Sequence, residues 1–253
     1  MESNYLSLTK DCGILLQGTP QDYPDGMVAA INKPYGWSSS DVVRKIKFRL
    51  KRFFKVKNIK VGHAGTLDPL ATGVLLVCIG KATKLSEELQ KTRKEYIAEF
   101  TFGATTPSFD LEKPIDAEYP WEHITPEMVQ DMVRSFIGPQ DQVPPVFSAK
   151  FVDGLRAYEA ARQGIEIELK SSPIEIYDIE ILKMDLPRVR MRIECSKGTY
   201  IRALARDMGA ALRSGAHLTE LIRTASGGTR ISDCVSPDEF EQFIPAPPES
   251  HCL

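Results

Sequence analysis

The residue whose setting points most directly to chemistry is Asp68, the single carboxylate in an unbroken stretch from Gly62 to Gly73. The stretch reads Gly-His-Ala-Gly-Thr-Leu-Asp-Pro-Leu-Ala-Thr-Gly and is rich in turn-forming residues. Its glycines permit positive φ angles or close backbone approach, and Pro69 disfavours helical geometry at Asp68. We therefore expect Asp68 to project from a fixed loop, where a carboxylate can act as a nucleophile or as a proton acceptor. Taken alone, however, an Asp-Pro pair is more typical of a turn than of a catalyst.

Together with its surroundings, this stretch resembles the signature of the TruB family of tRNA pseudouridine synthases. Other parts of the family pattern occur in the same order along the chain, so that the resemblance runs from about Val28 to Ile244. These parts are Asn32 to Ser39, Lys94-Glu95-Tyr96, Ser148-Ala149-Lys150, Tyr158 to Gly164 and Cys195 to Arg202. Chance does not plausibly supply so many matches in one order.

The resemblance implies an enzyme that isomerises the T-loop uridine, position 55 of tRNA, to pseudouridine without a cofactor and without a metal ion. The reaction breaks the bond between C1' of the sugar and N1 of the base, rotates the base and rejoins it through C5. It needs a carboxylate beside the sugar and a pocket that excludes water, because water would give hydrolysis instead. Asp68 matches the family's catalytic aspartate. Attack at C1', addition to the base and removal of the C2' proton are all open roles for it.

Five further residues match positions that the family uses in catalysis or binding. Tyr96 matches the tyrosine that stacks on the flipped base and lies near C5, so we expect it to take part in both binding and catalysis. Arg202 matches an arginine that we expect to pair with Asp68 and to keep that carboxylate ionised. The other matches are to residues that contact the RNA or line the uridine pocket, namely His63, Tyr200 and Leu221. Outside the family context, each has an ordinary structural interpretation.

Two loops beside the expected site need separate mention. Lys33 lies in the family's Lys-Pro-x-Gly loop, which we expect to pack beside the Asp68 loop. The family's Thr-Asp-Thr-x-Asp is replaced here by a segment running from Thr106 to Asp110, with Pro107 at the place of the first aspartate. Asp110 keeps the second place, so we expect catalysis to survive and any RNA contact of the first aspartate to change.

The formal net charge of −2 is unexpected for a protein that binds nucleic acid, but it hides a segregation of charge. Nine Lys or Arg and no Asp or Glu lie between Val42 and Leu67, which leaves 23 of the 32 basic residues against 34 acidic residues elsewhere. Interleaved with phenylalanines, this basic segment has the pattern expected for contact with a phosphate backbone, and it directly precedes the Asp68 loop. A solvated helix face with its apolar side buried is the alternative.

Composition and cysteine usage argue against several classes of protein. No apolar run approaches the ~18 residues of a membrane helix, and the N-terminus lacks the pattern of a secretion signal, so we expect a cytoplasmic enzyme. The five cysteines are scattered, with no Cys-x-x-Cys motif and no histidine at ligand spacing. We therefore expect neither a disulfide framework nor a zinc site. We expect a monomer that binds the T stem-loop of tRNA and needs no obligate protein partner.

The elements that must position these residues do not alternate regularly, which predicts an α+β fold. Strands are expected over Met27 to Ile31, Gly73 to Gly80, Tyr96 to Phe102, Ile174 to Leu182, Val189 to Cys195 and Leu218 to Thr224. Helices are expected after Ser38, over Lys81 to Lys91, from Thr125 to Gly138, over Leu155 to Arg162, over Tyr200 to Leu212 and from Pro237. On its strand, Tyr96 should share one face with Ala98, Phe100 and Phe102.

By resemblance, the fold is a pseudouridine-synthase-like core: one mixed, largely antiparallel sheet flanked by helices, with a central catalytic cleft. We expect residues 1–26 to form an N-terminal extension, residues 27–244 the catalytic domain and residues 142–170 an inserted thumb that closes on the RNA. Residues 245–253 would be a short tail, without the PUA module that many family members carry. Two alternatives stay open: pseudouridine formation in another RNA, and a tRNA-binding folding chaperone with secondary catalysis.

Overall fold

The structure, a computed structural model, describes residues 5–147, 151–152, 155–156 and 169–245. The chain divides into two compact units, one comprising residues 1–92 and 223–253 and the other residues 93–222. Strand β13 (Ala216–Ser226) contributes residues to both units. The thumb motifs expected at 148–150 and 158–164 lie outside the described residues.

The sheet of the first unit is centred on two neighbouring antiparallel strands, β2 and β4, in which Ala29 lies opposite Val77. β1 pairs with β2 in parallel, whereas β3 pairs with β4 and β14 with β13 in antiparallel orientation. The strands are β1 (Leu6–Leu8), β2 (Met27–Lys33), β3 (Val61–Ala64), β4 (Thr72–Ile79), the end of β13, and β14 (Thr229–Arg230). Residues 73–79 of β4 are all buried, as is typical of a strand covered on both faces.

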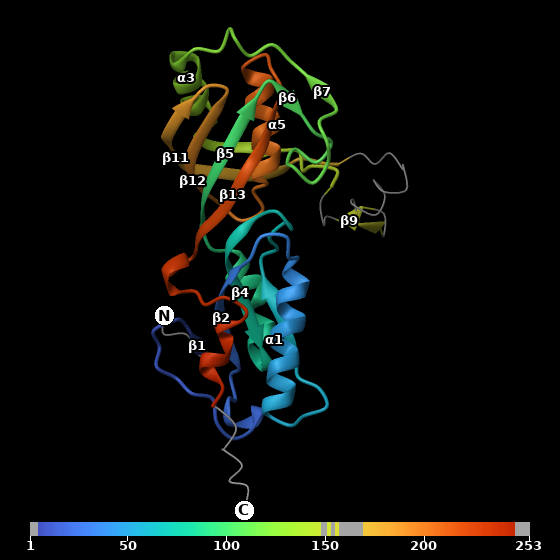
Figure 1. Ribbon diagram of the computed structural model, residues 1–253, viewed down its shortest axis with the longest axis vertical. Coiled ribbons are helices and arrows are strands. Elements are labelled where there is room, and N and C mark those ends of the chain that lie inside the picture. The colour runs from blue at the N-terminus through green and yellow to red at the C-terminus, as the bar shows by residue number, and fades with distance from the viewer. Residues whose placement is uncertain (1–4, 148–150, 153–154, 157–168, 246–253) are drawn as a thin grey trace, which may run out of the picture. The chain divides into compact units, whose positions relative to one another are not determined.

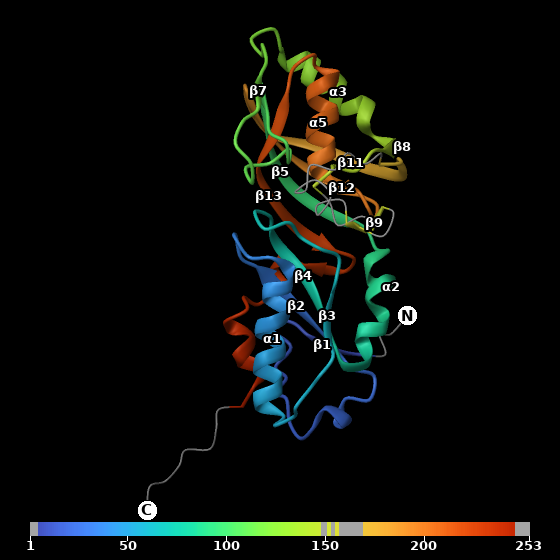
Figure 2. The ribbon, with the colours of Figure 1, turned by 90° about the vertical axis from the view of Figure 1, so that its right-hand side faces the viewer.

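The principal helix of the first unit is α1 (Ser39–Phe53), which begins as the sequence predicts. The Ser38 hydroxyl accepts a hydrogen bond from the Asp41 amide at 3.1 Å, and the Asp41 carboxylate accepts one from the Ser38 amide at 2.8 Å. Figure 2 shows α1 and α2 on opposite sides of the strands. The other helices of this unit are α2 (Ser86–Gln90) and the short 3₁₀ helices η1 (Pro20–Asp22), η2 (Gly80–Leu85), η3 (Ile231–Asp233) and η4 (Glu239–Phe243).

The sheet of the second unit has the strand order β13-β5-β12-β11-β8 (Figure 1). Its strands are β5 (Lys94–Phe102), β8 (Gly138–Gln142), β11 (Ser172–Asp185), β12 (Arg188–Cys195) and the beginning of β13. Two small pairs accompany it: β6 (Ala104–Thr105) with β7 (Ala117–Glu118), and β9 (Phe151–Val152) with β10 (Leu155–Arg156). The pairs β5–β12, β11–β12 and β8–β11 are antiparallel, whereas β1 and β2 pair in parallel, so the strand pairing of the protein is mixed. The expected α+β class and the mixed, largely antiparallel pairing are confirmed.

Two helices of the second unit match their sequence signals. α3 (Pro126–Phe136) has Thr125 as its N-cap, whose hydroxyl accepts a hydrogen bond from the Met128 amide at 3.3 Å. α5 (Ile201–Ala211) buries almost its entire first two turns. On β5, alternate residues are buried, so Tyr96 shares its face with Ala98 and Phe100 as predicted.

Several local predictions were wrong. Gly62 to Ala64 form part of β3 and not of the Asp68 loop, because their backbone groups pair with β4. Leu155 and Arg156 form a strand where a helix was expected, and the remainder of that expected helix lies outside the described residues. Lys81 to Lys91 divide into a 3₁₀ helix and a short α-helix, and the last helix is a 3₁₀ turn from Glu239. No helix in the described part of the chain is long and apolar enough to cross a membrane.

Candidate active site

The residues predicted to form the site are divided between the two units. His63 and Asp68 belong to the first unit, on β3 and in the loop that joins β3 to β4. The second unit supplies the other four: Tyr96 on β5, Tyr200 and Arg202 at the start of α5, and Leu221 on β13.

The Asp68 loop is an irregular turn, as the sequence predicts. Asp68 is half-buried, and its carbonyl accepts a hydrogen bond from the Ala71 amide at 3.1 Å, which closes a turn over Pro69. At the end of the loop, Gly73 has a φ of 101°, and a Cβ there would lie 2.2 Å from the carbonyl oxygen of Arg223. Only glycine allows β4 to approach β13 this closely.

Ser39, the first residue of α1, holds the residue that precedes Asp68. Its hydroxyl accepts a hydrogen bond from the Leu67 amide at 2.9 Å and donates one to the Leu67 carbonyl at 3.1 Å. Ser39 is 2% exposed and Leu67 4% exposed, so no bulk water competes for these groups. The start of α1 therefore fixes both backbone polar groups next to the candidate catalytic residue.

Lys33, at the end of β2, holds the residue that follows Asp68. Its ammonium donates hydrogen bonds to the carbonyls of Pro34 (3.0 Å), Trp37 (2.6 Å) and Pro69 (3.1 Å), while the Gly36 amide donates to the same Pro69 carbonyl at 2.9 Å. This confirms that the Lys-Pro-x-Gly loop packs beside the Asp68 loop.

The charge of Lys33 is controlled by its surroundings. Burial lowers its pKa from 10.5 to about 8, the negative charge of Asp68 opposes this shift, and the positive charge of Arg223 adds to it. Lys33 thus interacts electrostatically with both the candidate catalytic carboxylate and a second buried cation.

Arg223, on β13, is a buried cation that the sequence analysis missed. It is 2% exposed, and its guanidinium donates to the carbonyls of Val74 (2.6 Å), Gly65 (3.0 Å) and Thr66 (3.5 Å). Gly65 and Thr66 precede Asp68 in the chain, whereas Val74 follows it and lies in β4. A planar guanidinium with several donors can join two chain segments in this way, which a single ammonium does less well.

His63 lies on β3 opposite Val77, and its ring is partly enclosed. Its Nδ1 atom is buried and has no hydrogen-bond partner among the described residues. Burial, and to a lesser extent the positive charge of Arg223, lower the pKa of His63 below 6.5. Both effects favour the uncharged form of the imidazole.

Tyr96 lies on the buried face of β5, opposite Ile193 of β12, and is 8% exposed. Its ring orientation is thus fixed by a regular strand rather than by a loop. Leu221, on β13, is half-buried. Both residues lie in regular strands, and sites built on strands are more precise than sites built on loops.

Arg202, the second residue of α5, is 4% exposed and joins three segments of the second unit. Its guanidinium donates to the carbonyls of Ser108 (3.1 Å) and Phe147 (2.9 Å), and its Nε atom lies 3.7 Å from the Asp110 carboxylate. Asp110, the aspartate retained in the altered motif, therefore pairs with Arg202. The pairing of Arg202 with Asp68 stays a prediction.

Tyr200, the N-cap of α5, is held by a side chain that the sequence analysis also missed. The side-chain oxygen of Gln142 accepts a hydrogen bond from the Tyr200 backbone amide at 2.8 Å, and its side-chain nitrogen donates one to the Tyr200 carbonyl at 3.1 Å. Gln142 is buried at the end of β8. It fixes the residue from which α5 starts, two positions before Arg202.

Gln142 and Arg223 had no signal in the sequence that marks them, because each acts on backbone groups far away along the chain. Ser39 lies in the family motif Asn32 to Ser39, but the motif gave no indication of its hydrogen bonds with Leu67. A buried, charged residue such as Arg223 is detectable only once its strand is known to be internal. In the described part of the chain, no group of three or more His, Cys, Asp or Glu side chains is placed to hold a metal ion.

Comparison with known proteins gives consistent similarities. Residues 51–201 match the family described as TruB family pseudouridylate synthase (N terminal domain). The chain is 56% identical over 223 residues to a Phocaeicola vulgatus protein named tRNA pseudouridine synthase B, with 88% of this chain and 95% of that protein covered. A protein of the same name from Flavobacterium johnsoniae is 48% identical over 227 residues, with 89% and 99% covered.

Among solved structures, the chain is similar to one in a Cbf5-Nop10-Gar1 complex, with a TM-score of 0.63 and 27% identity. It is also similar to one in the archaeal box H/ACA sRNP Nop10-Cbf5 complex, with a TM-score of 0.59 and 27% identity. The alignments cover 92% and 86% of this chain but only 63% and 55% of the solved chains. The chain thus spans less than two thirds of these two structural relatives.

Proposed function

This chain belongs to the TruB family of pseudouridylate synthases and is a pseudouridine-forming enzyme, and we propose that it modifies the T-loop uridine at position 55 of tRNA. The observation that carries this proposal is the match, over nearly the whole length of the relatives, to proteins named tRNA pseudouridine synthase B. The enzyme acts on tRNA in the cytoplasm as a monomer, and sedimentation of the purified chain tests the last point.

In the proposed mechanism, Asp68 provides the carboxylate beside the sugar of the target uridine. Support comes from the backbone anchors on both sides of it, which hold the carboxylate where a reacting sugar can be aligned with it. Attack at C1', addition to the base and removal of the C2' proton are all compatible with this arrangement. All three need the same fixed and ionised side chain.

The uridine must leave its stack to reach Asp68, and we propose that Tyr96 then stacks on the flipped base. The position of Tyr96 within the regular strand β5 supports this role. The ring of His63 can fill the space that the base vacates, while Tyr200 and Leu221 contact the uridine. Tyr96→Phe should keep tRNA binding and slow turnover, and wild-type turnover in this variant would remove Tyr96 from the chemistry.

The test is the isomerisation of an unmodified tRNA transcript, followed by release of the C5 hydrogen from labelled uridine and by mapping of the modified position. Asp68→Asn is compared with wild type and with Asp25→Asn, which changes an exposed aspartate of the same unit. We expect modification of the T-loop uridine by wild type and Asp25→Asn, and none by Asp68→Asn. Full activity of Asp68→Asn would contradict the proposed mechanism.

A second candidate is the same reaction on another RNA. Its support is the similarity to a chain solved in an archaeal box H/ACA sRNP complex. Mapping decides between the two, since modification at a site outside the T loop would retain the reaction and change the substrate. A folding chaperone role would show as tRNA refolding that persists in Asp68→Asn.

A further inference from the structure

One side of α1, in the first unit, carries several basic residues. Val42, Ile46 and Leu50 of this helix are fully buried and define its inner side. Helical periodicity of 3.6 residues per turn places five others away from that side, of which Arg44, Phe48 and Arg52 are exposed and Lys47 and Lys51 are half-buried. Together with the exposed Lys55, which lies just beyond the helix end, we call this set the outer face of α1: Arg44, Lys47, Phe48, Lys51, Arg52 and Lys55.

Ion pairs divide the basic residues of α1 into two groups. On the flank of the helix, Lys45 pairs with Asp238 and Arg49 pairs with Glu241, both near the 3₁₀ helix η4. These two cations are therefore already matched by carboxylates within the unit.

The outer face lacks such matching charges. Arg44 pairs with Asp41 one turn before it, but the other four cations form no ion pair with any described residue. These four are Lys47, Lys51, Arg52 and Lys55. The sequence could not make this distinction, because it counts all nine basic residues of the segment alike.

Phe48 lies in the middle of this face and is 55% exposed. The Arg52 guanidinium lies over its ring, 5.6 Å from the centroid. An exposed aromatic ring among unpaired cations is the combination that proteins use to bind nucleic acid, because the ring contacts bases or sugars while the cations contact phosphates.

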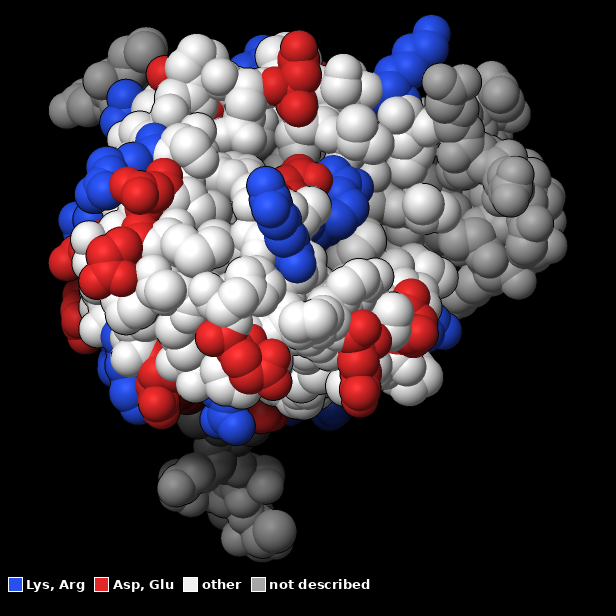
Figure 3. All heavy atoms as spheres, turned by 90° about the horizontal axis from the view of Figure 1, so that it is seen from above, with Lys and Arg blue, Asp and Glu red and all other residues white. Residues whose placement is uncertain are grey.

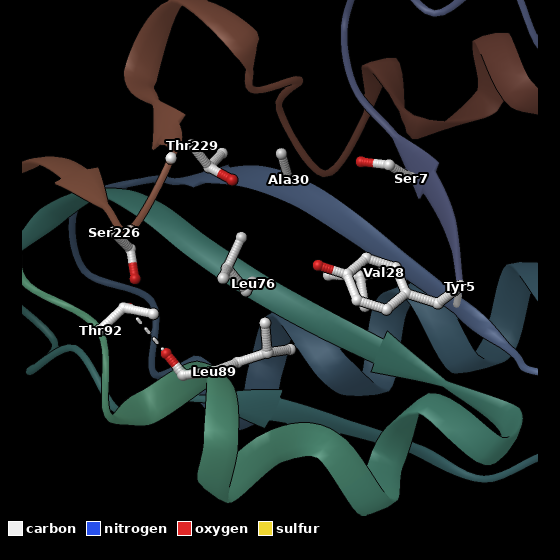
Figure 4. A pocket seen from close by; sticks show the side chains of 11 residues that line it. Tyr5, Ser7, Val28, Ala30, Leu76, Leu89, Thr92, Ser226 and Thr229 are labelled. Atoms are coloured by element: carbon white, nitrogen blue, oxygen red, sulfur yellow. Dashed lines mark hydrogen bonds between the residues drawn. The ribbon is translucent and has the colours of Figure 1, made fainter. Parts of the chain in front are cut away.

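The local excess of positive charge contrasts with the rest of the protein. Outside the basic segment, the chain contains 23 basic residues and 34 acidic residues. Figure 3 shows a face of the second unit on which Lys, Arg, Asp and Glu are interspersed over largely uncharged surface. A polyanion is therefore attracted to the outer face of α1 more than to that mixed surface.

The position of α1 relates this face to the candidate catalytic loop. Ser39 at the start of the helix holds Leu67, next to Asp68, and both belong to the first unit. A helix of this length extends about 22 Å from that point. The outer face thus begins near the reacting carboxylate and continues along one direction away from it.

We propose that the outer face of α1 binds the phosphate backbone of the tRNA substrate, up to about one helix length from the target uridine. The proposal rests on the proposed function in taking tRNA as the partner. It assigns binding to Lys47, Lys51, Arg52 and Lys55, with Phe48 against a base or sugar, and assigns none to Lys45 and Arg49.

The test compares two matched pairs of substitutions on one helix. The first is Lys51→Gln with Arg52→Gln, and the second is Lys45→Gln with Arg49→Gln. Each removes one lysine and one arginine, and glutamine has nearly the same helix propensity. Thermal unfolding followed by circular dichroism checks that all variants are folded.

Binding of full-length unmodified tRNA is measured from 50 to 200 mM salt. Each lost phosphate contact should reduce the slope of log K against log salt by about 0.9. For Lys51→Gln with Arg52→Gln, we therefore expect a slope smaller by about 2 and affinity at 100 mM weaker by about tenfold or more. The Lys45→Gln and Arg49→Gln pair should retain the wild-type slope.

A kinetic measurement separates this role from a general defect. Single-turnover rates at saturating tRNA should be unchanged in Lys51→Gln with Arg52→Gln, because the face binds RNA remote from the reacting atoms. Phe48→Ala should also weaken binding, by about fivefold or more for a stacked base. It should leave the salt slope unchanged because it removes no charge.

Two results would overturn the proposal: unchanged tRNA affinity in the Lys51 and Arg52 variant, or an equal loss of tRNA affinity in the Lys45 and Arg49 variant. Failure of the proposed function is recognised separately, from the mapped position. If wild type modifies a uridine outside the T loop, position 55 is rejected, while a selective loss of tRNA binding in the Lys51 and Arg52 variant still supports the surface.

Discussion

The hydrogen bonds of Ser39 provide a sharp test of how Asp68 is positioned. In Ser39→Ala, the Leu67 amide and carbonyl both lose their partner while remaining buried. An unsatisfied buried polar group costs about 1–3 kcal/mol, so two give about 2–6 kcal/mol. The better helix propensity of alanine offsets about 0.5 kcal/mol of this loss. We expect the free energy of unfolding to fall by about 1.5–5.5 kcal/mol.

The same substitution should reduce turnover, because Leu67 precedes Asp68 directly. A displacement of about 1 Å at a reacting group can cost about a hundredfold in rate, so we expect kcat to fall between about tenfold and a hundredfold. Binding of tRNA should change little, because Ser39 is buried and makes no surface contact.

Ser40→Ala is the matched control for this experiment. Ser40 is the next residue of α1, is exposed and has no hydrogen bond from its side chain to any described residue. Urea unfolding and turnover of tRNA are measured for both variants. If Ser39→Ala matched Ser40→Ala within about 0.5 kcal/mol and had the same kcat, the claim that α1 fixes the Asp68 loop would be refuted.

Three buried cations give further predictions. Arg223→Lys should lose most of the contacts to Gly65, Thr66 and Val74, which should lower the free energy of unfolding by about 2–3 kcal/mol and also lower kcat. Arg230→Lys, at an exposed site, should change neither quantity. Equal urea midpoints for the two variants would contradict the role of Arg223. Because burial lowers the pKa of Lys33 to about 8, the unfolded chain binds more protons between pH 8 and 10.5, and the free energy of unfolding should rise with pH there by up to about 1.4 kcal/mol per unit. Urea unfolding of wild type and Lys33→Met at several pH values checks this, since an identical slope in the variant would exclude Lys33 as its source. Arg202→Lys should lower turnover and destabilise the second unit, because one ammonium does not span the carbonyls of Ser108 and Phe147. Hydrogen exchange of the backbone around Ser108 and Phe147 measures the loss of stability. Unchanged exchange and unchanged activity would contradict this role of Arg202.

Local sequence signals were sufficient for the start of α1 and for the buried face of β5. The capping box at Ser38 and Asp41 predicted the first, and the alternation of apolar residues predicted the second. Such signals lie within a few residues of one another, so the sequence displays them directly. The strand β3, which carries His63, was not predicted: Gly62 to Ala64 lie in a stretch rich in turn-forming residues, but they form a strand because β4 offers them hydrogen-bond partners.

The family motifs indicated the candidate catalytic residues but not all of the residues that hold them. Asp68 stands out because it lies within a rare, contiguous pattern. Arg223 and Gln142 do not stand out, because each acts on carbonyls or amides more than fifty positions away in the chain. The expectation that Arg202 pairs with Asp68 likewise gave no hint of its contacts with Ser108, Asp110 and Phe147.

The sequence by itself determined the reaction class, the α+β composition and the identity of the candidate carboxylate, because these depend on residue types and on short spacings. Tertiary structure alone decided which cations are available to bind a polyanion and which hold the Asp68 loop. Lys33 and Arg223 are buried against backbone carbonyls, Lys45 and Arg49 are paired with carboxylates, and Lys51 and Arg52 are free of ion pairs within the described residues. The physical reason is that the burial and pairing of a charge depend on segments distant in sequence that folding brings beside it.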